Sequence, residues 1–458
     1  MTIKTKTLRV CLMLALPFFL SGRLMAQDQT MSLKECITYT LQHHPNSTIY
    51  KNSAKLAGEK IRESRSALLP SISGNVGLDY NIKLATTVIP AGSLSTGSLS
   101  TNETKLQMGS KFSNTAYVQL DQKLFDRSAS LDIKTSKIDK EIADLNLLKE
   151  NETLIYNTAS AYYEVLTYAE KGKLLRESEK RYETTVSILK LRYAQGEEKK
   201  SEYNRAKVNY NNVQFEIESN NSSYKLALNK LKNSIGMDIE VPISIKDSVT
   251  NMDVKEMPLA IGLNMFDVNR VLDFQIDKKN LDIKKLDLKQ KKGAYLPTLS
   301  LYGKYGGNAY GSDFFPTLSN WYDYSVIGVK ATIPLFSGFK KQSQLAQSKL
   351  SLASLELTNK LNLQTYKLNI ENASTSIVST YTNLKKAKEN LQLATEMVDA
   401  STVEYREGTA TLSSLLDADY SNKEARTNYT TALLDYLTAQ LSYHKNKGTI
   451  TEFVNEIK

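Results

Sequence analysis

The stretch ALLPSIS (residues 67–73) returns as AYLPTLS (residues 294–300), 227 positions further along the chain. Each copy ends a charged run with helical periodicity and opens a segment in which apolar and polar residues alternate. Proline lacks a backbone N–H and disfavours helical geometry in the residue before it. The two stretches therefore predict the same helix-to-strand transition twice.

Two further pairs of segments repeat in the same order. Residues 118–126 (VQLDQKLFD) align with 329–337 (VKATIPLFS), and 191–203 (LRYAQGEEKKSEY) align with 403–415 (VEYREGTATLSSL). Each half of the chain then reads helix, LP turn, strand, loop, strand, very long helix, glycine turn, helix. This order predicts an internal two-fold repeat.

The domain organisation follows from this repeat. We predict a first structural repeat at 27–240, a linker at 241–258, a second repeat at 259–447 and a C-terminal tail at 448–458. Residues 1–26 read as a signal peptide, since basic residues precede a short apolar core and a small-residue cleavage site. Without those residues the net charge falls from +10 to +6, and Cys36 is the one remaining cysteine. No internal disulfide is then possible.

Alternation of apolar and polar residues predicts two pairs of strands. They are expected at about 72–82, 115–125, 298–306 and 325–335, with loops at 83–113 and 307–323. Their length matches what a tilted strand needs to cross a bilayer. The alternative is two amphipathic hairpins packed on a soluble core, because each strand alone is a weak signal.

Long helices follow each pair of strands. We expect them at about 128–194 and 338–406, with shorter helices at 199–236 and 411–446. Within the second long helix an apolar residue recurs every seven positions. These residues are Leu363, Ile370, Ile377, Leu384, Leu391 and Val398, with a weaker series of Leu148, Ile155, Tyr162 and Ala169 in the first. A sustained heptad predicts a coiled-coil seam.

The strands imply an assembly. A sheet in hydrocarbon must close so that every backbone group is paired, and four strands cannot close around a lumen. If these strands cross a membrane, several chains must share the barrel. Its interior would be lined by the polar side chains Asp79, Asn81, Gln119, Asp121 and Lys304.

With these features the chain resembles the TolC-like outer-membrane efflux proteins, the outer membrane factors of bacteria. The first helix (32–46), both LP turns, the turns RYAQG (192–196) and EYREG (404–408) and the last helix (411–426) are similar to that family. The resemblance implies a mixed fold of α-helices and transmembrane β-strands. In it, three copies form a 12-stranded β-barrel, four strands per chain, continued by a long α-helical coiled-coil barrel in the periplasm.

The resemblance also implies a function and partners. Such a protein is an exit duct in the cell outer membrane for a tripartite efflux or type I secretion system. Its expected partners are two further copies of the chain, membrane lipid, a periplasmic membrane-fusion adaptor and an inner-membrane transporter. The alternative is a soluble periplasmic coiled-coil adaptor or structural linker, which would explain the heptads but not the paired strands.

Family members narrow their tunnel about two helical turns past each glycine turn. Carried over by position, the periplasmic gate consists of Asp417, Ser414, Glu202, Arg205 and Tyr405. Serine and arginine depart from the acidic constriction of the family, and Tyr405 matches a residue thought to latch the closed state. Threefold symmetry would bring the Asp417 carboxylates close together, where they would attract cations. The alternative for these charged residues is an ordinary solvated helix face.

The two turns are the expected docking tips for the adaptor. Gly196 and Gly408 suit the left-handed conformation that ends a helix, and Thr409 follows the second glycine. The family has a small apolar residue before the glycine, whereas this chain has Gln195 and Glu407.

Other classes of function find little support in the sequence. The chain has only three histidines, His43, His44 and His444, without metal-ligand spacing. Motifs of phosphate-binding loops, metalloproteases and nucleophile elbows do not occur. Basic residues are interleaved with acidic ones, which does not favour nucleic acid. We therefore expect neither an enzyme nor a bound cofactor or metal.

Overall fold

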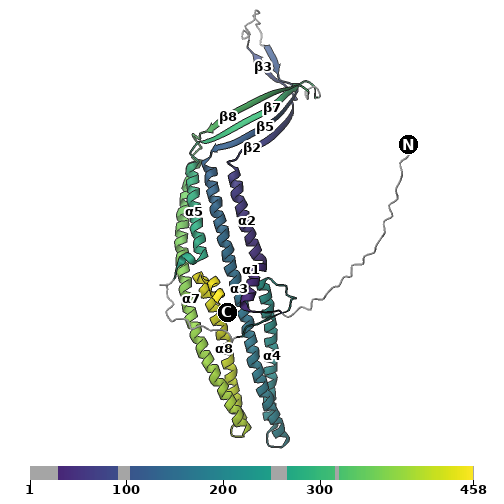
Figure 1. Ribbon diagram of the computed structural model, residues 1–458, viewed down its shortest axis with the longest axis vertical. Helices are drawn as coiled ribbons and strands as arrows, with labels where there is room; N and C mark the ends of the chain where they lie inside the picture. The colour runs from purple at the N-terminus through teal and green to yellow at the C-terminus, as the bar shows by residue number, and fades with distance from the viewer. Residues whose placement is uncertain (1–28, 91–103, 249–265, 315–318, 457–458) are drawn as a thin grey trace, which may run out of the picture. The chain divides into compact units, whose positions relative to one another are not determined.

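The computed structural model describes residues 29–90, 104–248, 266–314 and 319–456 (Figure 1). The chain forms two compact units: residues 1–40, 158–255 and 389–434 make the first, and residues 41–157, 256–388 and 435–458 make the second. Three long helices have residues in both units: α3 (Arg127–Ala194), α7 (Lys340–Arg406) and α8 (Leu412–Lys447); the end of α1 (Leu33–His43) also crosses the boundary. The expected signal peptide, 1–26, lies outside the described residues.

A four-stranded sheet is the main β structure of the second unit. Its strands are β2 (Ser71–Tyr80), β5 (Phe112–Phe125), β7 (Thr298–Gly311) and β8 (Trp321–Thr332). They lie in the order β2-β5-β7-β8, and every neighbouring pair is antiparallel (Figure 1). The four expected strands correspond to these four.

The strand ends differ from the sequence-based bounds. Beyond Tyr80 the backbone amide of Asn81 bonds to the Lys111 carbonyl in a turn, and β8 stops at Thr332, before Pro334, which cannot donate a ladder hydrogen bond. At the other end, β7 and β8 extend into the segment expected as a loop at 307–323. The expected loop at 83–113 contains an antiparallel hairpin of β3 (Ala85–Ile89) and β4 (Thr104–Met108).

The register puts most of the apolar side chains of the four strands on one face of the sheet. One row across the sheet runs through Ile72, Leu120, Gly303 and Ile327. The next row, which points to the opposite face, runs through Ser73, Gln119, Lys304 and Val326. On the apolar face Ile72 is 71% exposed and Ile327 81% exposed. Asn114 and Ala309, further along the same face, are buried, so the exposed part of this face lies nearer the helix end of the sheet.

The two LP turns have the same geometry, which answers why the motif occurs twice. After α2 (Pro45–Ser66), the amide of Leu69 donates to the carbonyl of Ser66 at 3.0 Å. After α5 (Leu272–Gly293), the amide of Leu296 donates to the carbonyl of Gly293 at 3.0 Å. In each copy the proline follows, and a strand of the sheet begins at the next residue.

The end of the chain is not a tail, as the sequence analysis had it. A short helix, α9 (Ile450–Glu456), buries Ile450 and Val454. Gly448, with φ of 71°, ends α8 and lets the chain turn. The Phe453 ring then stacks on His444 with ring centroids 4.3 Å apart. A 3-10 turn, η3 (Val268–Arg270), precedes α5 in the same unit.

The first unit contains α1 (Leu33–His43), α4 (Lys200–Ile235) and a small parallel sheet of β1 (Gln29–Met31) with β6 (Ile243–Ile245). The linker expected at 241–258 is therefore wrong over its described part, because β6 pairs with the start of the chain. The Asp247 carboxylate fixes this pairing by accepting from the Leu33 amide at 3.0 Å and from the Tyr162 hydroxyl at 2.7 Å. The rest of that segment lies outside the described residues.

The predicted heptad series of α7 forms a seam that is buried at four of its six positions. Ile370, Ile377, Leu384 and Val398 are buried, whereas Leu363 and Leu391 are half-buried. In the weaker series of α3, Ile155 and Tyr162 are buried but Leu148 is 51% exposed, so the series begins later than predicted. Within the described residues, no helix combines the length and apolarity required to cross a membrane.

Candidate gate at the helical turns

Both glycine turns adopt the conformation that the sequence predicts. Gly196 and Gly408 each have φ of 79°. The Gly196 amide donates to the backbone carbonyl of Tyr193 at 3.0 Å, and the Glu197 amide donates to the backbone carbonyl of Arg192 at 2.9 Å. At the second turn the Gly408 amide donates to the backbone carbonyl of Tyr405 at 3.1 Å. The Thr409 amide donates to the backbone carbonyl of Glu404 at 2.9 Å. These are paired Schellman motifs, which require a left-handed residue at the glycine.

Side chains at the two turns face solvent within the chain. Gln195, Glu407 and Thr409 are exposed, and the Thr409 hydroxyl donates to the Glu404 carbonyl at 3.0 Å. A β-carbon built at Gly196 or Gly408 would meet no atom within 4 Å. The glycines are therefore required by backbone conformation rather than by crowding.

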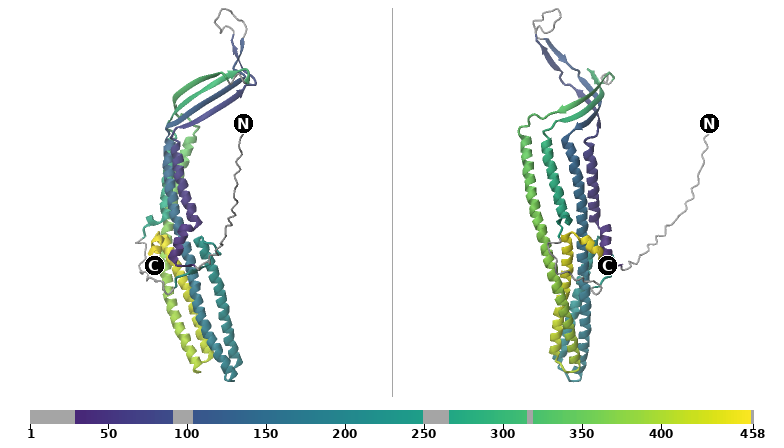
Figure 2. Two further views of the ribbon diagram at one scale, coloured as in Figure 1. Left: turned by 45° about the vertical axis from the view of Figure 1, so that its right-hand side comes forward. Right: turned by 60° about the vertical axis from the view of Figure 1, so that its left-hand side comes forward.

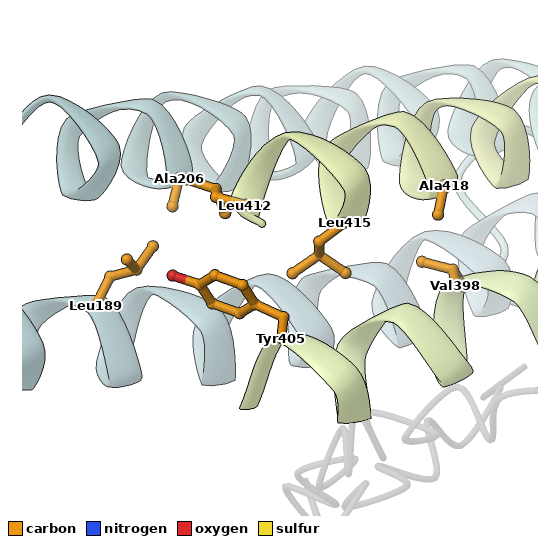
Figure 3. Close-up of a cluster of buried hydrophobic side chains, with 7 residues drawn as sticks. All are labelled: Leu189, Ala206, Val398, Tyr405, Leu412, Leu415 and Ala418. Carbon is orange, nitrogen blue, oxygen red and sulfur yellow. The ribbon is translucent and has the colours of Figure 1, made fainter. Parts of the chain in front are cut away.

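A small apolar core lies behind the turns (Figure 3). Leu189 from α3 and Ala206 from α4 are fully buried, and Val398 of α7 and Leu415 of α8 complete the contact. All four helices of the two turns thus contribute side chains to one cluster. Its tight packing ties the helices together directly next to the turns.

Tyr405 lies in the middle of this core and is only 3% exposed. Its ring lies under the Arg192 guanidinium, 5.5 Å from ring centroid to Cζ. Burial, together with the charges of Glu198 and Glu202, raises the pKa of the Tyr405 hydroxyl, and Arg192 opposes that rise. Within the described residues no hydrogen bond of good geometry reaches the hydroxyl. The latch role expected for Tyr405 from the family stays a prediction.

The other expected gate residues lie on two separate helix starts. Glu202 and Arg205 are one turn apart on α4, with 3.8 Å between their charged atoms. Ser414 lies in the first turn of α8, where its amide donates to the Thr411 hydroxyl at 3.2 Å. Asp417 is exposed one turn later. Among the hydrogen bonds and ion pairs of the described residues, none joins the α4 pair to the α8 pair.

A groove of about 660 Å³ runs between α3, α4 and α8 in the first unit. Asp417 lines it, together with the exposed rings of Phe215 and Tyr420. An ion pair between Lys423 of α8 and Glu216 of α4 is part of its wall. The groove is polar and open along its length.

The floor of this groove contains a buried polar cluster that the sequence analysis missed. The Tyr182 hydroxyl donates to the Asp419 carboxylate. The Arg426 guanidinium donates to the Leu174 carbonyl at 2.6 Å. Asn422 donates to the Thr395 hydroxyl at 3.0 Å. Burial and the positive charge of Arg181 lower the pKa of Arg426, whereas Asp419 counteracts this.

The spacing of these residues along α8 is the sequence signal that indicates their burial. Among the buried positions of α8 in this unit, one series runs through Leu412, Leu415, Asp419, Asn422, Arg426, Tyr429 and Leu433. The intervals alternate between three and four residues, as in a coiled-coil seam. A search restricted to apolar residues overlooks the three polar members in the middle.

The sheet holds four of the five residues expected to line a lumen. Asp79, Gln119, Asp121 and Lys304 all point to the face opposite the apolar one. Gln119 donates to Asp121 at 2.6 Å, and the Lys304 ammonium lies 5.1 Å from the centroid of the Tyr117 ring. Asn81 is not among them, because it lies in the turn beyond β2 and donates to the Ser110 carbonyl at 2.9 Å.

Clusters of three or more histidine, cysteine or acidic side chains suited to a metal ion do not occur in the described parts of the chain. His444 is packed against Phe453 and bonds with the Thr449 hydroxyl at 3.0 Å. It has a structural role in holding α9.

Comparison with known proteins gives one consistent result. The family model described as outer membrane efflux protein matches residues 49–237 and 273–444. The outer membrane protein TolC of Salmonella enteritidis is 25% identical over 418 residues, which is 86% of this chain and 77% of that protein. TolC of Vibrio cholerae is 22% identical over 95% of this chain and 96% of its own length.

A solved structure shows the same fold. The Campylobacter jejuni CmeC outer membrane channel superposes with a TM-score of 0.73 at 16% sequence identity. The alignment covers 91% of this chain and 86% of that one. The arrangement of a β-domain joined to long helices is thus shared with a channel of distant sequence.

Proposed function

Because the chain belongs to the outer membrane efflux protein family, we propose that it works as a closed ring of three copies that share one barrel. The chain is an exit duct of the outer membrane, with its helical part in the periplasm. The ring supplies what one chain lacks, namely a closed sheet around a water-filled path.

The observation that carries this proposal is the state of the four-stranded sheet. Its apolar face is exposed, and strands β2 and β8 are its two edges. Unpaired edge strands in hydrocarbon are costly, so they require partners. The strands alternate in direction, and β8 of one copy can therefore pair antiparallel with β2 of the next. Three copies of four strands then give the twelve strands that the family resemblance implies.

The helices next to the two edges support the same ring. α7 follows edge strand β8 and carries an exposed apolar stripe of Leu350, Leu357, Leu361 and Leu368. α2 precedes edge strand β2 and exposes Ile49 and Leu56. Apolar residues at intervals of seven and four are typical of coiled-coil contacts. In the proposed ring, α7 of one copy packs on α2 of the next.

The path through the ring would be polar. The face carrying Asp79, Gln119, Asp121 and Lys304 turns inward, while the apolar face meets lipid. At the periplasmic turns Asp417, Ser414, Glu202 and Arg205 would narrow the entrance, and the unpaired hydroxyl of Tyr405 would find its partner in the assembled ring. Gly196, Gly408 and Thr409 would form the tips that a periplasmic adaptor contacts, and an inner-membrane transporter would deliver the cargo.

This role needs no chemical catalysis by the chain. In this proposal residues 1–26 are a signal peptide for export. Each of the two structural repeats supplies two strands of the shared barrel. The rival role, a soluble periplasmic coiled-coil linker, leaves the exposed face of the sheet unexplained. We therefore favour the duct, for efflux of small molecules or for secretion of protein.

The test is purification of the chain in detergent, an unheated gel and conductance in a planar bilayer. We expect a band at about three times the chain mass that collapses to one chain on boiling, and discrete current steps. The heated sample serves as the control for both readouts. A monomer without current would contradict the proposal, and recovery in the soluble periplasmic fraction would support the linker.

A further inference from the structure

Exposed aromatic and aliphatic side chains gather where the sheet meets the helices. In the connection from β8 to α7, Leu335 is 92% exposed, Phe336 79% and Phe339 69%. Leu124, Phe125 and Tyr295 are exposed at the neighbouring strand ends. We call these six residues the junction girdle. In sequence, Leu335 continues the alternation of the apolar face of β8 beyond the end of that strand.

One member of the girdle is held in a strained backbone conformation. Phe339 has φ of 62° and is the only residue other than glycine with positive φ in the described chain. A side chain is less favourable than glycine in this left-handed region, because its Cβ crowds the following carbonyl oxygen. The strain is not offset by burial, since the Phe339 ring is largely exposed and packs on the Phe336 ring, which is also exposed, with centroids 5.7 Å apart.

A set of basic residues lies directly on the helix side of the girdle. Arg65 lies in the last turn of α2 and Lys292 in the last turn of α5, while Arg127 begins α3 and Lys340 begins α7. We call these four residues the basic collar. All four are exposed, and none has an ion-pair partner among the described residues. Figure 2 shows these four helix ends side by side at one end of the sheet.

Contacts between the helix ends make the collar continuous. Lys341, next to Lys340, donates to the Ala294 carbonyl at the end of α5 at 2.6 Å. Arg127 lies so close to Gly293 that a β-carbon there would be 2.7 Å from its Cγ. The Ser64 and Ser136 hydroxyls join α2 to α3 at 2.6 Å.

Neighbouring acids do not neutralise the collar. Asp126 pairs with Lys123 at 3.0 Å and accepts from the Ser128 amide at 2.9 Å. Glu63 pairs with Lys60 at 2.7 Å. The carboxylates in these turns are thus already engaged, and the collar keeps an excess of positive charge.

From this arrangement we propose that the girdle and collar form a docking surface for anionic phospholipid, with headgroup phosphates on the collar and acyl chains on the girdle. A shallow pocket of about 160 Å³, lined by Tyr295, Phe336, Phe339 and Lys341, joins the two parts. The surface is continuous with the lipid-facing side of the sheet, and its charge is complementary to phosphate. Basic clusters beside a membrane segment bind anionic headgroups in this way. The inference rests on the proposed function, since it requires the sheet to lie in a membrane.

The experiment measures how lipid stabilises the intact oligomer. Full-length protein in detergent is titrated with dioleoylphosphatidylglycerol or with dioleoylphosphatidylcholine. The dissociation temperature of the oligomer is then read from unheated gels. We expect the anionic lipid to raise this temperature at lower concentrations than the zwitterionic lipid.

Two variants separate the contributions. The double variant Lys292→Ser with Lys340→Ser should need about tenfold more anionic lipid for the same shift, because each basic group adds to headgroup attraction. Its matched control is Lys385→Ser with Lys386→Ser, two exposed lysines of α7 about 70 Å further along the same helix. The control should behave as the unmodified chain. Phe339→Gly should raise the dissociation temperature in detergent alone and reduce the further gain from either lipid.

The outcomes are distinct. Equal shifts with both lipids, or a Lys292→Ser/Lys340→Ser variant that matches its control, would overturn this inference while the oligomer and its current persist. A chain that forms no oligomer and conducts no current would overturn the proposed function, and this inference with it.

Discussion

Single residues in this chain carry their roles through burial and backbone conformation. Gly196 and Gly408 hold left-handed turns with open space around them, so only the backbone demands glycine. The Tyr405 hydroxyl is buried beside the Arg192 guanidinium, and within the described residues no hydrogen bond of good geometry reaches it. His444 is neutral and packed, and it fixes the last helix.

The packing of His444 predicts a pH dependence. Burial, with a smaller contribution from the charge of Lys447, lowers the pKa of His444 to about 4, and Glu452 opposes this. The unfolded chain therefore takes up a proton on His444 as the pH falls below about 6.5, while the folded chain does not until about pH 4. Stability present above pH 6.5 is lost across this interval.

We expect His444→Gln to remove this contribution. The free energy of unfolding of the unmodified chain should decrease by about 1–2 kcal/mol more than that of the variant between pH 7.5 and pH 4.5, after allowance for partial exposure. Denaturant titrations in detergent at the two pH values measure the difference. An identical pH response of the two proteins would show that His444 is not held neutral.

At the scale of elements, the buried polar cluster on α8 sets how this helix packs on α3. Asp419, Asn422 and Arg426 occupy seam positions where leucine would be ordinary. A polar seam residue is satisfied only in one register. Tyr182 and the Leu174 carbonyl supply those partners from α3. The cluster therefore defines the register of the two helices beside the candidate gate.

Removing one partner tests this role. Tyr182→Phe leaves the buried Asp419 carboxylate without its hydroxyl donor, which should cost about 1–3 kcal/mol of unfolding free energy. Tyr420→Phe is the matched control, because Tyr420 is exposed on the same helix as Asp419. Denaturant midpoints in detergent compare the two. Equal midpoints would mean that the cluster does not contribute to stability.

Some of these elements are predictable from the sequence and others are not. The LP turns, the four strands and the heptads of α7 were predictable because their signals are local and periodic. The pairing of β1 with β6 was not, since it joins residues more than two hundred positions apart through Asp247. Helix α9 was missed because it is short and owes its stability to contacts of His444 with Phe453. For the candidate site, the sequence predicts where its residues lie along the chain. It does not predict which residues meet in space, such as Arg192 over the Tyr405 ring.

At the scale of the whole molecule, the proposed ring would cover surfaces that one copy exposes. Within the described residues these are apolar side chains on one face of the sheet, such as Ile72 and Ile327, and the leucines of α7. The open edges β2 and β8 lie at opposite sides of the same sheet, so the contact is between two different surfaces. Contacts of this kind close into a ring when the rotation per copy divides a full turn.

The most direct test of this shared sheet is a disulfide between its edges. Ser71 begins β2 and Thr332 ends β8, both at the helix end of the sheet. In a background with Cys36→Ser, the double variant Ser71→Cys with Thr332→Cys is oxidised and run on a denaturing gel without reductant. Ser73→Cys and Lys330→Cys, on the same face of each strand, allow for a stagger of the register.

The account predicts a covalent band of three chains, with a two-chain intermediate, that disappears on reduction. Neither single cysteine should produce a three-chain band. A set of double variants that inserts in the outer membrane yet yields only single chains would contradict a sheet shared between copies.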